Sequence, residues 1–136
     1  MKAGHESLVM SYGKEKGFKQ LEVWKLSMRL TSRIYDVTEE FPNSQKNVLA
    51  PQMQRSALSI PSNIAEGSAR AGKKEFIQFL YIAKASLAEL ETQVILAYAR
   101  KYIVKQDYLE LLPLMDSLNK MLRKLIESQK TEKIIP

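Results

Sequence analysis

Apolar side chains recur at intervals of three and four residues through four long stretches of the chain. This spacing places them along one side of an α-helix, and it predicts four amphipathic helices. The first is expected over residues 19–40 and ends before Pro42, because the residue that precedes a proline is disfavoured in the α conformation. Its apolar stripe consists of Leu21, Trp24, Met28, Thr31 and Tyr35, widened by Val23, Leu30, Ile34, Val37 and Phe41.

The second helix is expected over residues 45–71, and two prolines bear on its shape. Pro51 is tolerable near the start, whereas Pro61 lies in the interior, where a proline removes a backbone hydrogen bond. A kink or a break at Pro61 is therefore expected. The apolar seam of this helix repeats at steps of four, three and four residues, at Met53, Ala57, Ile60 and Ile64.

Beside this seam runs a row of small polar and charged residues, which continues onto the third helix at Ser86, Glu89 and Gln93. Such a row is either a ligand or catalytic cleft or a set of polar groups at a subunit interface, each bonded to a neighbour. The interface is the better interpretation. We assign to it Gln52, Ser56, Ser59, Asn63, Glu66, Arg70, Glu89 and Gln93. Glu66 and Arg70, one turn apart, form either an ordinary helix pair or a buried pair that fixes register.

The third helix is expected within residues 73–100, and its core stripe consists of Phe76, Phe79, Leu80, Ala83, Leu87, Leu90, Val94 and Ala97. A fourth helix follows with Asp107 as its N-cap, Pro113 in its first turns, and a stripe at Leu111, Met115, Leu118, Leu122 and Leu125. Four amphipathic helices with short connections predict an all-α fold, an up-down-up-down antiparallel four-helix bundle. The bundle should occupy residues 18–129, between a polar tail over 1–17 and a second tail over 130–136.

Composition narrows the class of protein. The chain has 136 residues, which is the size of one domain, and 45% of them are hydrophobic. It has no cysteine, which excludes disulfides and thiolate sites and favours a reducing compartment such as the cytoplasm. The most apolar stretch, residues 76–99, includes Lys84, Glu89 and Glu91, so no membrane segment is expected.

The residues that catalysis and metal binding need are scarce. The single histidine, His5, lies in the N-terminal tail, so a carboxylate and histidine metal site of the di-iron kind cannot be assembled in the bundle. Without histidine or cysteine there, no nucleophile with its base and orienting group can be identified either. We therefore expect no enzyme, no metal and no cofactor.

Several short motifs resemble those of a known family. They are Leu21-Glu22-Val23-Trp24-Lys25, Phe41-Pro42, Gln52-Met53-Gln54-Arg55-Ser56-Ala57, Ser59-Ile60-Pro61-Ser62-Asn63-Ile64-Ala65-Glu66-Gly67, Lys74-Glu75-Phe76 and Glu89-Leu90-Glu91-Thr92-Gln93. The run from Ser59 to Gly67 is the specific one, since amphipathicity alone would not place a proline and an asparagine inside a helix. With these residues the chain resembles the four-helix bundle proteins of the 23S rRNA intervening-sequence family. Ala85 departs from the pattern, where a glycine is expected.

The resemblance implies a four-helix bundle that is often a homopentamer, without established catalysis. A related protein, the accessory variability determinant of diversity-generating retroelements, is a basic pentamer that binds nucleic acid and partners a reverse transcriptase. By analogy, the partners to expect are further copies of this chain, RNA or DNA, and a protein such as a reverse transcriptase.

The net charge of +6 favours acidic partners, above all nucleic acid. The candidate phosphate contacts are Arg55, Arg70, Lys73, Lys74, Lys84, Arg100, Lys101, Lys120, Arg123 and Lys124. Each of them could simply be a solvated surface residue, but a fivefold ring would repeat a weak basic patch and add avidity. In the alternative, the basic surface keeps an oligomer soluble and serves only protein contacts.

Trp24 could stack on a base, although a lone tryptophan on an apolar stripe is more often a core residue.

Overall fold

The computed structural model describes residues 17–131, and every regular element within this range is a helix. A 3-10 turn, η1 (Gly17–Gln20), precedes α2 (Glu22–Glu39), and a short helix α3 (Asn43–Lys46) precedes α4 (Leu49–Ala69). The chain then forms the two longest helices, α5 (Lys73–Ala99) and α6 (Lys105–Thr131). The predictions for residues 1–16 and 132–136 lie outside the described residues.

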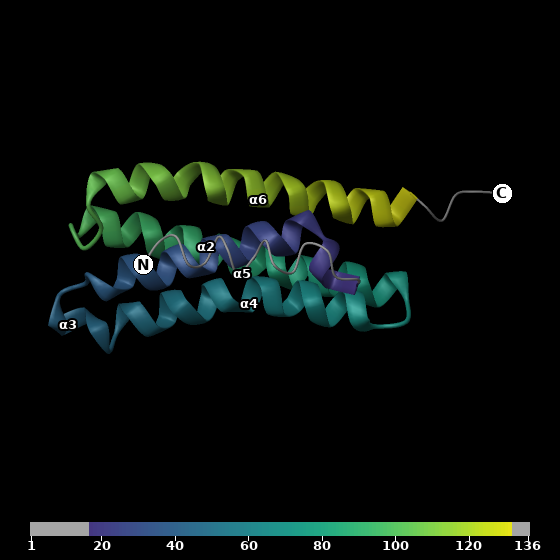
Figure 1. The fold of residues 1–136 in the computed structure, drawn as a ribbon, viewed down its shortest axis with the longest axis horizontal. Coiled ribbons are helices and arrows are strands. Elements are labelled where there is room, and N and C mark those ends of the chain that lie inside the picture. The colour runs from purple at the N-terminus through teal and green to yellow at the C-terminus, as the bar shows by residue number, and fades with distance from the viewer. Residues whose placement is uncertain (1–16, 132–136) are drawn as a thin grey trace.

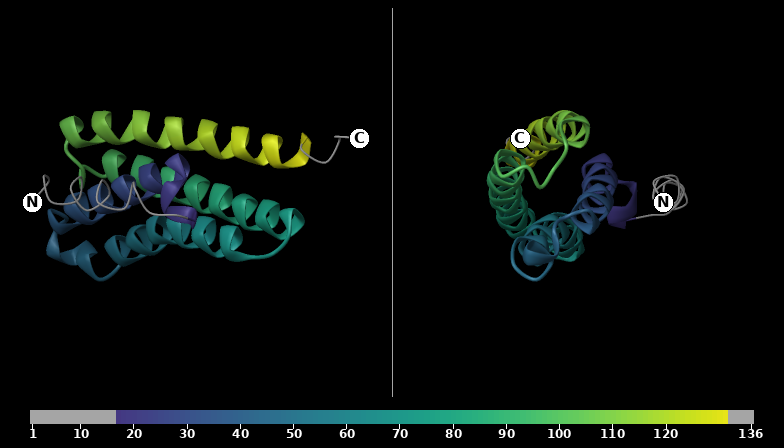
Figure 2. Two further views of the ribbon diagram at one scale, coloured as in Figure 1. Left: turned by 45° about the vertical axis from the view of Figure 1, so that its right-hand side comes forward. Right: turned by 90° about the vertical axis from the view of Figure 1, so that its left-hand side faces the viewer.

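The four long helices form the predicted bundle, in which each helix runs antiparallel to the next along the chain (Figure 1). Contacts join α2 to α4, α4 to α5, α5 to α6, and α6 back to α2. The helices therefore surround one core, as the end-on view in Figure 2 shows. The all-α fold and its topology are confirmed.

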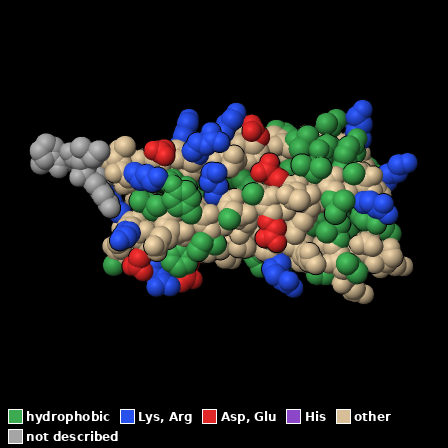
Figure 3. All heavy atoms as spheres, turned by 180° about the vertical axis from the view of Figure 1, so that it is seen from behind, with side chains coloured by type: hydrophobic (Ala, Val, Ile, Leu, Met, Phe, Trp, Pro, Cys, Tyr) green, Lys and Arg blue, Asp and Glu red, His purple; other side chains and the backbone are tan. Residues whose placement is uncertain are grey.

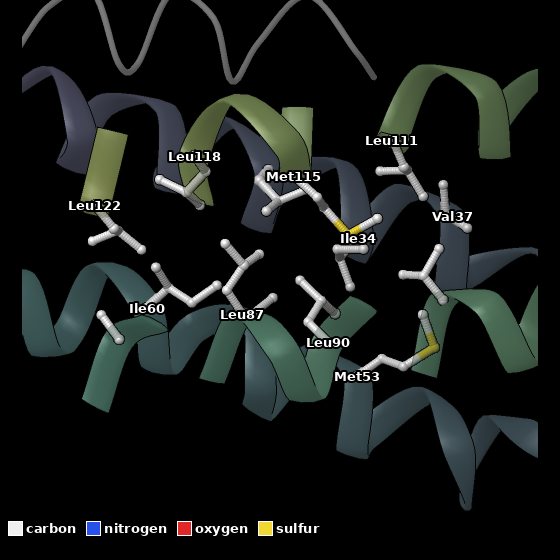
Figure 4. Packing of buried hydrophobic residues seen from close by; sticks show 14 of the residues in the cluster. Ile34, Val37, Met53, Ile60, Leu87, Leu90, Leu111, Met115, Leu118 and Leu122 are labelled. Atoms are coloured by element: carbon white, nitrogen blue, oxygen red, sulfur yellow. The ribbon is translucent and has the colours of Figure 1, made fainter. Parts of the chain in front are cut away.

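The core consists of the apolar stripes that helical spacing predicted. Side chains from all four helices point toward one another in its centre (Figure 4). Removing a large apolar side chain from water contributes roughly 1.5–3 kcal/mol, so these residues supply most of the driving force for folding. The largest of the fully buried side chains are Leu30, Ile34, Met53, Ile60, Ile64, Leu80, Leu87, Leu90, Leu111, Met115, Leu118 and Leu122.

The buried side of α2 is rotated slightly from the apolar stripe that was predicted for the first helix. Tyr35 is 40% exposed, whereas Ser27 and Thr38 are buried. Both hydroxyls donate to backbone carbonyls of their own helix, so a small polar residue fits the core without an unpaired group. Trp24 is buried, which confirms the prediction of a core residue, and its ring meets Phe18 edge to face.

The predicted break at Pro61 is wrong, because α4 continues without interruption from Leu49 to Ala69. A proline has no N–H, so the carbonyl of Ala57, four residues earlier, loses its helical donor. The hydroxyl of Thr31 on α2 compensates in part, since its Oγ1 lies 3.1 Å from that carbonyl oxygen and shares its single proton with the carbonyl of Ser27 at 2.7 Å. A bend at this position stays a prediction.

Several helix ends also differ from the prediction. The segment expected to open the second helix at residue 45 forms the separate helix α3, and α4 starts only at Leu49. The last helix starts at Lys105, so Asp107 lies in its first turn instead of at the N-cap. It continues to Thr131, and the tail expected from residue 130 therefore begins inside the helix.

Candidate functional site

The polar row lies between α4 and α5, and part of it is satisfied within the chain. The hydroxyl oxygens of Ser59 and Ser86 are 2.8 Å apart and share a hydrogen bond across the two helices. The Asn63 amide donates to the backbone carbonyl of Ser59 at 2.8 Å and to its hydroxyl at 3.0 Å. The Ser59–Ser86 bond therefore joins α4 to α5, and Asn63 braces Ser59 within α4. These hydrogen bonds need no neighbouring subunit.

Glu66 and Arg70 continue the row toward the end of α4. The Arg70 guanidinium donates to the Glu66 carboxylate at 2.7 Å, and it also lies 5.2 Å from the ring centre of Phe79. The hydrogen bond to Glu66 raises the pKa of Arg70 above its ordinary value. Both side chains are about half exposed, at 46% and 50%. Within the single chain they form an ordinary surface pair, and a buried pair that fixes register at a subunit interface stays a prediction.

The middle of the row opens into a polar hollow of about 280 Å³, lined by Gln52, Arg55, Ser56, Ser59, Ser86 and Glu89. It contains one cationic and one anionic side chain, and neither makes an ion pair with another described residue. We call this feature the polar hollow.

Gln93 lies at the edge of this region. Because α4 and α5 are antiparallel and Ser59 faces Ser86, helix geometry places Gln93 opposite Gln52, two turns along each helix. Gln93 is only 9% exposed, and its Oε1 atom is buried without a hydrogen-bond partner among the described residues. An unpaired buried acceptor costs about 1–3 kcal/mol, so the Gln93 amide is a strained feature at the edge of the polar hollow.

The outward side of α5 is apolar, which the sequence analysis did not predict. Tyr81, Ile82, Ile95 and Leu96 are exposed large apolar side chains, with Ile95 at 53% and Leu96 at 52%. Residues 92–99 contain no charge, and this signal could have indicated the surface. A helix that is apolar on every side is usually buried on every side.

A second hollow, of about 310 Å³, extends this apolar surface toward the start of α4. Figure 3 shows hydrophobic side chains gathered toward one end of this face of the molecule, with Lys and Arg along the edge formed by α6. Gln52 lines both hollows, so the polar and the apolar part meet there. The residues that line the second hollow are Gln45, Val48, Leu49, Gln52, Leu96, Arg100 and Tyr102.

The structure separates the ten predicted phosphate contacts into distant groups. Arg70, Lys73 and Lys74 lie around one end of α5, and Arg100 and Lys101 lie around the other. A helix of 27 residues is about 40 Å long, so these two groups do not form one patch. The others lie on α4 at Arg55, on α5 at Lys84, and on α6 at Lys120, Arg123 and Lys124.

Some of these cations are already paired. Arg70 binds Glu66 and lies 3.8 Å from Glu75, and Lys120 lies 3.2 Å from Asp116. The larger set makes no ion pair within the described part of the chain and retains its charge for a partner. It consists of Arg55, Lys74, Lys84, Arg100, Lys101, Arg123 and Lys124.

Arg33 is a buried cation that the sequence analysis missed. Its guanidinium lies 3.4 Å from Asp36, 3.4 Å from Asp107 and 3.0 Å from Glu110, and it thereby connects α2 to α6.

Within residues 17–131, no group of histidine, cysteine, aspartate and glutamate side chains is arranged to hold a metal ion. No described helix is long and apolar enough to cross a membrane.

A family model described as 23S rRNA-intervening sequence protein matches residues 19–124. The chain belongs to this family. The motifs quoted from the sequence, with the run from Ser59 to Gly67 the most specific of them, therefore identified the family correctly.

The fold of this 23S rRNA-intervening sequence protein also occurs in a solved structure from Bacteroides thetaiotaomicron. That structure is a protein of unknown function from the S23 ribosomal protein family. It is 29% identical in sequence, and the match covers 77% of the present chain and 95% of the other, with a TM-score of 0.72. No curated protein matches the sequence significantly.

Proposed function

We propose that this protein is a non-enzymatic oligomeric adaptor that assembles through the side formed by α4 and α5. Assembly would bring together several copies of its basic surface, and this repeated surface would bind nucleic acid. The observation that carries the proposal is the exposed apolar side of α5, at Tyr81, Ile82, Ile95 and Leu96. Such a surface is unfavourable in water, at roughly 25 cal/mol for each Å² of apolar area left exposed. A second copy of the chain would cover it.

The dimensions of this side suit an interface. Helices of 21 and 27 residues that lie side by side present a strip roughly 30–40 Å long and 20 Å wide, or about 700 Å². A standard interface buries about 800 Å² on each partner. The unpaired Oε1 of Gln93 supports the same side, because a rotation of its amide would turn this acceptor toward a donor on a neighbouring subunit. Arg55 and Glu89 in the polar hollow offer opposite charges for pairs across the contact.

Assembly is tested by light scattering on the purified chain. We expect a single species larger than the monomer, and we expect Ile95→Asp to dissociate it, because a carboxylate would be buried in the contact. Leu109→Asp is the matched control, since Leu109 is equally exposed, at 53%, but lies on α6. A monomeric wild-type chain, or equal effects of both substitutions, contradicts assembly through α5.

Nucleic-acid binding is supported by the unpaired cations. Each phosphate that a protein neutralises contributes about 0.9 to the slope of log affinity against log salt for duplex DNA. If three of these cations each contact one phosphate, affinity should fall about 40-fold between 50 and 200 mM salt. Fluorescence anisotropy with a labelled oligonucleotide measures this slope. An affinity that does not respond to salt contradicts the proposal.

The second candidate is an adaptor that binds a protein instead of nucleic acid. The apolar hollow between Val48, Leu96 and Tyr102 favours it, because an apolar anchor side chain of a partner would fit there beside Arg100. A reverse transcriptase is one such partner by analogy with the accessory determinants. Two results together would support this candidate over the first. The assembled chain would show no binding to nucleic acid even at 20 mM salt, and the Leu96→Asp substitution would abolish binding of a protein partner.

A further inference from the structure

The connection between α5 and α6 brings aromatic rings and cations together at one end of the bundle. The rings of Tyr98 and Tyr108 stack in parallel, with centroids 3.9 Å apart and an angle of 4° between their planes. Arg100, Lys101 and Lys105 lie beside this pair along the chain, and all three are exposed. None of the three makes an ion pair with a residue in the described range 17–131. We call these five residues the tip cluster.

The backbone of the tip cluster turns in a way that favours glycine. The amide of Lys101 donates to the carbonyl of Tyr98 at 2.9 Å, and the amide of Tyr102 donates to Ala97 at 2.8 Å. This pair of hydrogen bonds ends a helix with a left-handed residue, which is usually glycine. Here the residue is Lys101, with φ of 66°, the one non-glycine at positive φ among the described residues. Lysine is less favourable than glycine at this φ, and such an outlier motivates the hypothesis that its charge has a function.

The acidic residues nearest the tip cluster are directed elsewhere. Asp107 and Glu110, in the first two turns of α6, both lie against the guanidinium of Arg33 on α2. Arg33 also lies against Asp36, so its single positive charge offsets only part of the negative charge of these acids. The three cations of the tip cluster make no ion pair with them, and the charge of the cluster itself stays positive.

We propose that the tip cluster binds single-stranded nucleic acid, with phosphates on the three cations and a base against the stacked tyrosines. This inference rests on the proposed nucleic-acid function and names the ligand and its site. A free strand can turn a base out onto an aromatic ring, whereas a duplex keeps its bases paired and stacked inside. Rings combined with cations are the arrangement that binds single strands without sequence preference.

The test compares two charge variants of the full chain. The tip variant combines Arg100→Gln, Lys101→Gly and Lys105→Gln, and its fold is protected because glycine is favoured at that φ. The control variant combines Lys120→Gln, Arg123→Gln and Lys124→Gln, and it removes the same charge from α6. Affinity is measured by fluorescence anisotropy in 50 mM salt, with a 20-nucleotide single-stranded RNA and with a duplex of the same sequence.

We expect the wild-type chain to bind the single strand more tightly than the duplex. The tip variant should lose at least tenfold in affinity for the single strand, and the control variant should lose less. Tyr98→Leu should weaken single-strand binding roughly 5- to 100-fold, which is the range for loss of one stacked base, whereas Tyr98→Phe keeps the ring and should weaken binding less. Thermal unfolding of both Tyr98 variants shows whether the fold is kept, and Tyr108→Leu serves as the second variant if Tyr98→Leu unfolds.

Four outcomes overturn the inference. If the control variant loses as much affinity as the tip variant, or if the duplex binds as tightly as the single strand, the site lies elsewhere and the proposed function still stands. If polyglutamate displaces the RNA at equal charge concentration, the tip cluster recognises acidic chains in general, including those of a protein. If the wild-type chain binds neither nucleic acid, the proposed function itself fails.

Discussion

Gly67 lies where α4 and α5 approach closely, and its replacement by alanine tests the packing of the bundle. A Cβ atom at this position would lie 2.6 Å from the Cβ of Phe79 and 3.1 Å from Cδ1 of Phe76. The Cβ of Phe79 is attached to the backbone of α5, so no rotation of a side chain relieves the first contact. The two helices would have to separate by about 1 Å to restore the usual carbon–carbon distance of roughly 3.5–4.0 Å.

The magnitude follows from two opposing effects. Overpacking of this kind costs typically about 1–3 kcal/mol, and alanine in place of glycine inside a helix returns at most about 1 kcal/mol. We therefore expect Gly67→Ala to lower the free energy of unfolding by about 1–2 kcal/mol, or the melting temperature by roughly 3–10 °C.

The assay is thermal and urea unfolding followed by circular dichroism at one fixed protein concentration, because assembly makes the melting temperature depend on concentration. Gly72→Ala is the matched control, since a Cβ there meets no atom within 4 Å. We expect this control to cost about 0.5–1 kcal/mol, because Gly72 is the N-cap of α5 and alanine is a poorer N-cap than glycine. A Gly67→Ala protein as stable as the wild type would refute the close approach of α4 and α5.

Three further predictions concern polar contacts. Arg33→Met should lower the free energy of unfolding by about 2 kcal/mol in urea, because three carboxylates lose their shared cation. The loss is moderate because Glu110, one of the three, is half exposed and stays hydrated. Thr31→Val should lower the free energy of unfolding by about 1 kcal/mol, because the carbonyl of Ala57 loses a hydroxyl donor. The loss should be smaller in a Pro61→Ala background, where residue 61 regains an N–H that can donate to this carbonyl. A double-mutant cycle measures the difference. Tyr81→Phe should lower the pKa of Lys130 in an NMR titration, because the hydrogen bond to the Tyr81 hydroxyl is what raises it.

Much of the fold follows from periodicity, because spacing along the chain determines which side chains share one side of a helix. Met53, Ile60 and Ile64 were predicted as core and are fully buried. The predicted polar row also exists, at the boundary of α4 and α5. Its bonding could not be predicted, since whether Ser59 meets Ser86 or a second subunit depends on how two helices pack.

The candidate sites depended more strongly on packing. The sequence could name the cations, but it could not show that Arg70 and Arg100 lie at opposite ends of a helix about 40 Å long or that Arg70 is neutralised by Glu66. Tyr98 and Tyr108 are ten residues apart, and only the reversal of the chain between α5 and α6 stacks their rings.

By itself, the sequence determined the four helices, the core side of each one and the family, because all three depend on local spacing and short motifs. Only the tertiary structure decided that Thr31 supports the carbonyl freed by Pro61 and that α5 keeps an apolar side in water. The physical reason is that burial and hydrogen bonding depend on which helix lies opposite, and that choice involves residues far apart in the chain.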